Sequence, residues 1–190
     1  MLKAGKQEVV VLSPISPMEI YLTSRDDFST FAETGCDIIN NIGSISDYVH
    51  LPKVGQLVLA DKENHWNRAE VMEEKVLANG NILVKLLDFP EVLEVEKSQL
   101  RQAPQSTLEF PVLAVKCALD GFYGKEKEAS KKVEKLRNLE MDFEILEGEV
   151  LGSQDGLTRV KIPAIESKLM EPVLAAKLSR EALLKNLLKK

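Results

Sequence analysis

Carboxylate side chains gather on two short segments in the middle of the chain. Asp61 and Glu63 lie on the first segment, and Glu91 and Glu94 lie on the second. Residues 54–109 hold ten acidic and six basic residues, so their net charge of −4 accounts for most of the net charge of −5 of all 190 residues. A carboxylate binds an unmodified guanidinium through paired N–H donors, and methylation removes donors. These acids favour recognition of a cation; the alternative is that they are solvated loop charges without a ligand.

Metal and thiol chemistry have few candidate residues. The chain has two histidines, His50 and His65, and two cysteines, Cys36 and Cys117, with no Cys-x-x-Cys pair. This set does not supply the ligands of a zinc site. Both cysteines lie among apolar neighbours, which favours buried free thiols in a reducing compartment over a disulfide. We therefore expect no metal and no cofactor.

The overall composition limits the class of protein. Hydrophobic residues make up 44% and charged residues 29% of the chain, which is typical of a globular protein. The negative balance argues against a broad nucleic-acid surface. No apolar run approaches the roughly 20 residues of a membrane-spanning helix, and residues 1–7 lack the apolar core of a secretory signal. We expect neither nucleic acid nor membrane among the partners.

Hydrophobic periodicity divides the first half of the chain in two. Residues 8–12 and 18–23 are predicted to be strands separated by a proline-containing break, and a helix follows from a cap at Asp26 or Asp27 to Gly43. From residue 54 the period changes to two. Strands are predicted over 57–60, 68–78, 82–89 and 92–95, with Asn79–Gly80 as a hairpin turn. Short strands at this density indicate a small barrel.

The pattern changes again after Pro111. A strand is predicted over 112–119, a charged helix over 125–141, and a hairpin that joins 143–152 to 157–162. A last helix is predicted from Glu171 to Lys190, with Pro172 in its first turn. Core packing is the favoured use of its leucines, and partner binding is the alternative.

The middle region resembles the Tudor domain. The matching stretches are Gly55–Ala60, Trp66–Val71 and Val84–Glu91, and the flanking residues resemble the strands that enter and leave extended Tudor domains. In that family a five-stranded Tudor barrel is inserted into a staphylococcal-nuclease-like OB fold. The resemblance implies a mainly β fold with helices (α+β). It places the N-terminal part of the OB body and a linker helix at 8–50, the Tudor barrel at 54–109 and the rest of the OB body at 111–190.

The resemblance also implies a binding site. Extended Tudor domains usually hold symmetrically dimethylated arginine between four aromatic rings, with an asparagine that contacts the guanidinium. The four ring positions fall on Asp61, Asn67, Leu86 and Phe89, and the asparagine position falls on Glu91. Only Phe89 is aromatic, and each missing ring forfeits a cation–π contact of about 0.5–2 kcal/mol. We expect a degenerate cage that does not hold methylarginine, with Asp61 or Glu91 as carboxylate for an unmethylated arginine.

Three further residues have structural interpretations. Trp66 matches a packed position of the Tudor barrel, so core packing is favoured over ligand stacking. Arg68 and Asp88 resemble a family pair that ties adjacent strands, and as a buried pair they would hold the register.

These observations lead to one preferred function and several alternatives. The resemblance implies a non-catalytic scaffold module of the piRNA pathway that binds the N-terminal tail of a Piwi-family Argonaute, in the cytoplasm and at perinuclear germ granules (nuage). We expect the arginine to be unmethylated and the groove to lie between barrel and OB body. The alternative is an assembly domain that has lost peptide binding. RNA binding by the OB face is less favoured, and nuclease activity is ranked last because strands 8–12 and 157–162 offer no cluster of acids for a metal.

Overall fold

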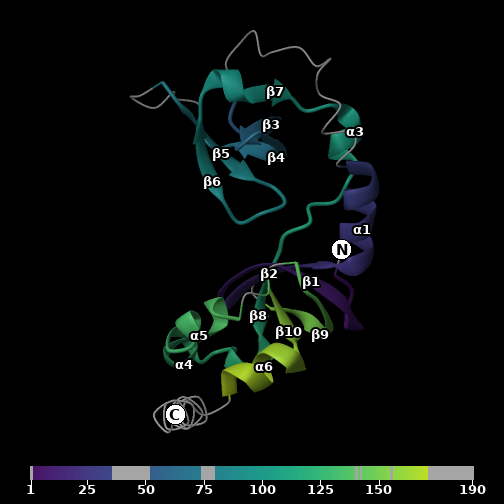
Figure 1. The fold of residues 1–190 in the computed structure, drawn as a ribbon, viewed down its shortest axis with the longest axis vertical. Helices are drawn as coiled ribbons and strands as arrows, with labels where there is room; N and C mark the ends of the chain where they lie inside the picture. The colour runs from purple at the N-terminus through teal and green to yellow at the C-terminus, as the bar shows by residue number, and fades with distance from the viewer. Residues whose placement is uncertain are drawn as a thin grey trace, which may run out of the picture.

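The computed structural model describes residues 2–35, 52–73, 80–139, 141, 143–154 and 156–170. These residues form two five-stranded sheets. The first closes into a barrel in the order β1-β2-β8-β10-β9, which we call the outer barrel. The second has the order β6-β5-β4-β3-β7, and we call it the inserted sheet because its strands all fall between β2 and β8 in the chain. Figure 1 shows the inserted sheet above the outer barrel.

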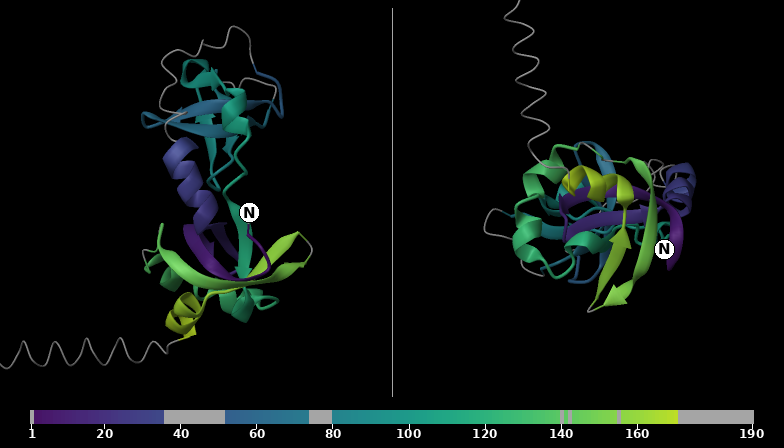
Figure 2. Two further views of the ribbon diagram at one scale, coloured as in Figure 1. Left: turned by 90° about the vertical axis from the view of Figure 1, so that its right-hand side faces the viewer. Right: turned by 90° about the horizontal axis from the view of Figure 1, so that it is seen from below.

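The outer barrel is built from both ends of the chain. Its strands are β1 (Gly5–Ser16), β2 (Glu19–Ser24), β8 (Val115–Leu119), β9 (Ile145–Gln154) and β10 (Leu157–Lys161). Around it lie the 3-10 helix η4 (Asp120–Phe122) and the helices α4 (Glu126–Ser130), α5 (Val133–Arg137) and α6 (Pro163–Met170). Alternate residues of β1 and β2 point inward, so Val9, Val11, Ile20 and Leu22 share one core with Phe122. Figure 2 shows α6 packed beneath the barrel.

The inserted sheet is smaller. Its strands are β3 (Leu57–Lys62), β4 (His65–Val71), β5 (Ile82–Leu86), β6 (Val92–Val95) and β7 (Leu100–Gln102), with the 3-10 helix η3 (Lys97–Gln99) between the last two. Its core holds small and branched residues such as Val58, Ala69 and Val84. Side chains of this size allow the sheet to bend tightly around its own interior.

Two connections join the sheets. One is α1 (Arg25–Thr30), which continues into the π-helical turn η1 (Phe31–Gly35), and the other contains α3 (Gln105–Leu108). Phe31 packs against two apolar clusters, one of Leu59 and Ala103 and the other of Val10, Leu12 and Leu113, so a single ring links the two bodies. It also meets Phe110 of the second connection edge to face, at 5.9 Å between ring centroids. Both connections are therefore packed against each other at the junction (Figure 2).

The mainly β fold with helices, and the predicted hairpin of β9 and β10, are confirmed. The N-cap of α1 is Ser24, two or three residues before the predicted Asp26 or Asp27. The Oγ of Ser24 accepts the Asp27 N–H at 3.2 Å. The predicted break at residues 13–17 was wrong in extent. β1 runs through Pro14 to Ser16, and irregular register with β2 accommodates the proline, which has no N–H to donate.

Other predicted elements have different bounds. The strand predicted over 68–78 begins earlier, at His65, directly after a two-residue turn at Glu63–Asn64. It ends at Val71, and residues 74–78 of the prediction lie outside the described residues. The helix predicted over 125–141 is two short helices, α4 and α5. Helix α6 was not predicted. The hairpin turn at Asn79, the helix predicted beyond Gly35 and the one predicted over 171–190 lie outside the described residues, wholly or in part.

Candidate binding site at the junction

A hollow of about 570 Å³ lies where the inserted sheet meets the outer barrel. We call it the junction hollow. The inserted sheet contributes the β3–β4 hairpin and the turn after β5, and the outer barrel contributes β1 and a residue just before β9. The lining residues are Leu12, Ser13, Lys62, Glu63, His65, Asn67, Leu86, Phe89, Pro90, Glu91 and Phe143. The groove expected between the two bodies therefore exists.

The β3–β4 hairpin forms one wall of the hollow. Lys62 pairs with His65 and Ala60 pairs with Asn67, so these side chains share one face of the hairpin. The Asn67 amide donates to the His65 carbonyl at 2.7 Å, which holds the amide at the edge of the hollow. The two turn residues, Glu63 and Asn64, both have positive φ (54° and 66°), the backbone of a tight hairpin turn.

The turn between β5 and β6 forms the facing wall. The Leu86 N–H donates to the Glu91 carbonyl at 2.9 Å, and the Glu91 N–H donates to the Phe89 carbonyl at 2.8 Å. These bonds fix the backbone that carries Phe89 and Glu91. The Lys62 ammonium donates to the Glu91 carboxylate at 2.5 Å across the hollow, and both side chains keep substantial exposure to solvent, 36% and 43%. The hollow therefore already contains one cation–carboxylate pair.

Asp61 lies on the other face of β3. It pairs with Trp66. Leu59 and Trp66 of that face pack together, on the side of the inserted sheet opposite to the core that holds Val58 and Ala69. Its Oδ1 is buried and has no hydrogen-bond partner among the described residues. Of the five residues predicted to bind peptide, Asn67, Leu86, Phe89 and Glu91 come together in the hollow, and Asp61 does not line it.

Phe143 is the site residue that sequence reasoning missed. It lies just before β9 of the outer barrel, far along the chain from the rest of the hollow. Its ring centroid is 6.4 Å from that of Phe89, with the planes at 83°. No motif marks it in the sequence, because its place in the hollow depends on how the two bodies meet.

Arg68 and Asp88 fix the inserted sheet to the second connection. Both side chains are buried, and Asp88 accepts from Arg68 Nε at 2.8 Å and from Nη2 at 2.5 Å. The remaining donors reach the carbonyls of Thr107, Phe110 and Pro111 at 2.8–2.9 Å. All five N–H groups of the guanidinium are satisfied. The predicted buried pair is confirmed, and it holds the connection as well as the strands.

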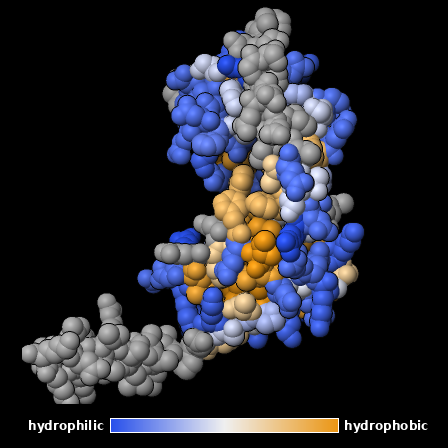
Figure 3. Space-filling model, turned by 45° about the vertical axis from the view of Figure 1, so that its right-hand side comes forward, coloured by the Kyte–Doolittle hydropathy of each residue, from blue (hydrophilic) through white to orange (hydrophobic). Residues whose placement is uncertain are grey.

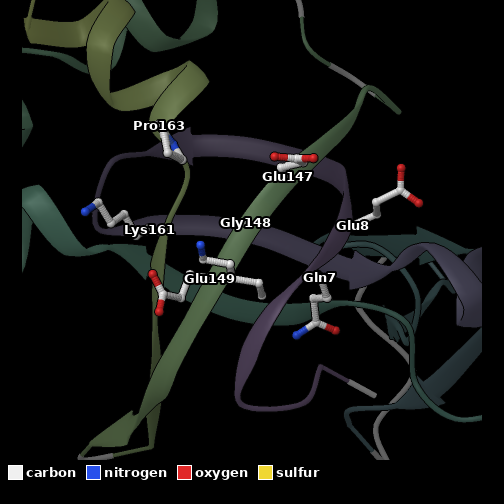
Figure 4. Close-up of a pocket in the computed structure, with 8 residues that line it drawn as sticks. Gln7, Glu8, Glu147, Gly148, Glu149, Lys161 and Pro163 are labelled. Carbon is white, nitrogen blue, oxygen red and sulfur yellow. The ribbon is translucent and has the colours of Figure 1, made fainter.

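A second hollow, of about 470 Å³, lies on the surface of the outer barrel (Figure 4). In the register of β1 and β9, Lys6 lies opposite Glu149 and Glu8 lies opposite Glu147. Glu8 also accepts from the exposed Arg25 at 2.6 Å. Because charges of both signs line it, this hollow does not favour a ligand of either charge.

The described part of the chain offers little for metal or thiol chemistry. Its His, Cys, Asp and Glu side chains form no group of three or more that could hold a metal ion. Burial raises the pKa of the Cys117 thiol to about 12, so this cysteine is protonated at neutral pH. Among the described helices, none has the length and apolar character needed to cross a membrane.

Comparisons with known proteins agree with this geometry. Residues 1–121 match the Tudor domain family. Human TDRD1 extended Tudor domain, solved with a symmetrically dimethylated peptide, superposes with a TM-score of 0.69 at 18% identity, over 85% of this chain and 83% of that chain. The extended Tudor domain TD3 of mouse TDRD1, solved with a MILI peptide containing dimethylarginine, gives 0.64 at 19% identity, over 85% and 84%.

A third structure, of Tudor in complex with Aubergine carrying a symmetrically dimethylated arginine, gives a TM-score of 0.68 at 21% identity, over 87% of this chain and 99% of that chain. No curated protein sequence matches the chain. At these identities the structural likeness establishes the fold.

Proposed function

Because the chain belongs to the Tudor domain family, we propose that it is a non-catalytic binding module whose junction hollow takes an arginine-containing peptide in its unmethylated form. The partner is the N-terminal tail of a Piwi-family Argonaute, and the setting is the piRNA pathway, in the cytoplasm and at perinuclear germ granules. Two observations support the partner class: TDRD1 was solved with a MILI peptide and Tudor with Aubergine.

The single observation that carries the proposal is that the Glu91 carboxylate and the Phe89 ring line the same hollow. An unmodified guanidinium presents five N–H donors and binds a carboxylate through two of them. Symmetric dimethylation replaces one donor on each terminal nitrogen with a methyl group, so fewer bonds to Glu91 are possible. The methyl groups would also meet polar side chains, Lys62 and Asn67, on the hairpin wall. The lining of the hollow thus favours the unmodified cation.

The proposal assigns the peptide contacts to Asn67, Leu86, Phe89 and Glu91. Asp61, which the sequence comparison placed in the cage, lies on the opposite face of β3. Its substitution is therefore the control that separates the two assignments.

The test is a titration with matched Piwi-tail peptides, one unmodified, one symmetrically dimethylated and one with alanine in place of arginine. We expect the unmodified peptide to bind most tightly. The Glu91→Gln variant should weaken it about tenfold or more, since a hydrogen bond to a charged group is worth about 1.5–3 kcal/mol, and Asp61→Asn should leave it unchanged. Tighter binding of the methylated peptide would overturn the proposal. Failure of every peptide to bind would also overturn it and would favour an assembly domain.

A further inference from the structure

Phe143 has a backbone conformation that aromatic residues seldom adopt. Its φ is +62°, in the left-handed region where the Cβ of an L-residue meets its own backbone. Its side chain is also exposed, at 51%. Glycine or asparagine is the usual residue in such a position. A ring that is half exposed buries little apolar surface to offset the backbone strain. A residue with a strained backbone and an exposed ring points to a use outside the core.

The strain at Phe143 is imposed by its neighbours in β1. The Phe143 N–H donates to the Val11 carbonyl at 2.7 Å, and the Val11 N–H donates to the Glu144 carbonyl at 3.1 Å. These two bonds hold the backbone on both sides of the residue. They involve main-chain atoms alone, so they would form with asparagine at position 143 as well. Phenylalanine is therefore not required for the backbone to take this path.

The ring of Phe143 faces the junction hollow. It meets Phe89 almost at a right angle, with 6.4 Å between centroids, and it meets Phe28 of α1 at 6.0 Å with the planes tilted by 34°. Figure 3 shows apolar surface gathered at the junction of the two bodies. Two perpendicular rings form an inside corner, and Glu91 lies two residues after Phe89 on the same turn.

We propose that Phe143 is the second aromatic wall of the arginine site, supplied by the outer barrel. The guanidinium lies in the corner between the rings of Phe89 and Phe143, with its N–H donors directed to Glu91. This inference rests on the function proposed above and deepens it. Where the inserted sheet supplies one ring, the outer barrel supplies the other, so the complete site exists only when both bodies are in place.

The experiment compares substitutions at Phe143 in the whole chain. Phe143→Asn keeps a residue that accepts the left-handed conformation but removes the ring. We expect the dissociation constant of the unmodified peptide to rise about 3- to 30-fold, the range of one cation–π contact, while the urea midpoint stays the same or increases. Phe143→Trp should retain the affinity for the peptide, and the affinity of Phe143→Leu should lie between those of Phe143→Trp and Phe143→Asn. Ile145→Asn is the matched control, because Ile145 is exposed at 47% and does not line the hollow.

The outcomes separate this inference from the proposed function. If the unmodified peptide binds, depends on Glu91 and binds Phe143→Asn equally well, the inference is overturned while the proposed function stands. If Phe143→Asn lowers the urea midpoint and leaves affinity unchanged, the ring only joins the two bodies and the inference is again overturned. If the wild-type chain binds no arginine peptide, the proposed function fails at the first titration, and the inference fails with it.

Discussion

The Lys62 ammonium and the Glu91 carboxylate meet at 2.5 Å across the junction hollow, and the pair ties the β3–β4 hairpin to the turn after β5. An arginine that binds Glu91 has to share or displace this lysine. The chain therefore carries a competitor for the proposed arginine ligand.

Removing this competitor should strengthen binding. We expect Lys62→Met to lower the dissociation constant of the unmodified arginine peptide about two- to fivefold, because an exposed ion pair is worth about 0.2–1 kcal/mol. Fluorescence anisotropy with a labelled peptide measures this dissociation constant. Lys85→Met is the control, since Lys85 is an exposed lysine of β5 that does not line the hollow. Equal gains in both variants would mean that general charge, rather than this pair, sets the affinity.

The buried Arg68 should be sensitive to a conservative change. Arg68→Lys keeps the positive charge but cannot reproduce two bonds to Asp88 and three to backbone carbonyls. We expect the free energy of unfolding, measured by urea denaturation, to fall by about 3–5 kcal/mol, because several buried carbonyl acceptors lose their donor and each unsatisfied group costs about 1–3 kcal/mol.

The same substitution at an exposed arginine provides the comparison for Arg68. Arg25 pairs with Glu8 at the surface, where solvent screens the interaction. Arg25→Lys should leave the urea midpoint unchanged. An Arg68→Lys variant as stable as Arg25→Lys would contradict the role assigned to the five-bond network.

Acid should destabilise the outer barrel partly through Glu19. Burial alone would raise the pKa of Glu19, but bonds from the Lys116 ammonium and the Tyr21 hydroxyl outweigh it, and the net shift is downward. A carboxyl whose pKa is lower in the folded state contributes stability above its unfolded pKa. That contribution is lost as the pH falls through the folded pKa.

Substitution of Glu19 tests this pH dependence. We expect Glu19→Gln to lower stability at pH 7 and to flatten the loss of stability between about pH 5 and pH 3, near and below the ordinary glutamate range. Urea denaturation across this pH range gives the free energy at each point. Parallel curves for the wild type and the variant would show that Glu19 contributes nothing to acid unfolding.

The Cys117 thiol should report unfolding of the outer barrel. It is fully buried, and its pKa of about 12 keeps it protonated. In a Cys36→Ser background, we expect a thiol reagent to label Cys117 at neutral pH only as fast as the barrel opens, and to label it at once in denaturant. Mass spectrometry follows the modified fraction with time. Rapid labelling of the native protein would show that β8 opens locally.

The sequence predicted the class of fold and most of the strands because alternation of period two is a local signal. The family resemblance placed the first ring position of the cage at Asp61, whereas in the structure Lys62, the next residue, lines the hollow. The difference is one residue in a strand, which moves a side chain to the other face. The turn at Glu63–Asn64 sets that register, and it lacks the glycine that would have marked it in the sequence.

Other parts of the site depend on contacts between distant segments. The predicted Arg68–Asp88 pair could be found from family resemblance, but its bonds to the second connection could not, because they join β4 to residues some forty positions later in the chain. Phe143 enters the hollow only through the meeting of the two bodies, and no local pattern encodes that contact.

The order of the strands also determines when each body can fold during synthesis. The last strand of the inserted sheet ends at Gln102, whereas Gly5 of β1 pairs with Val150 of β9. A chain emerging from the ribosome therefore has every strand of the inserted sheet well before β9, the second partner of β1, is made. Until then the β1–β2 hairpin has an open edge and an uncovered apolar face, so the half-made chain is exposed to pairing with other chains.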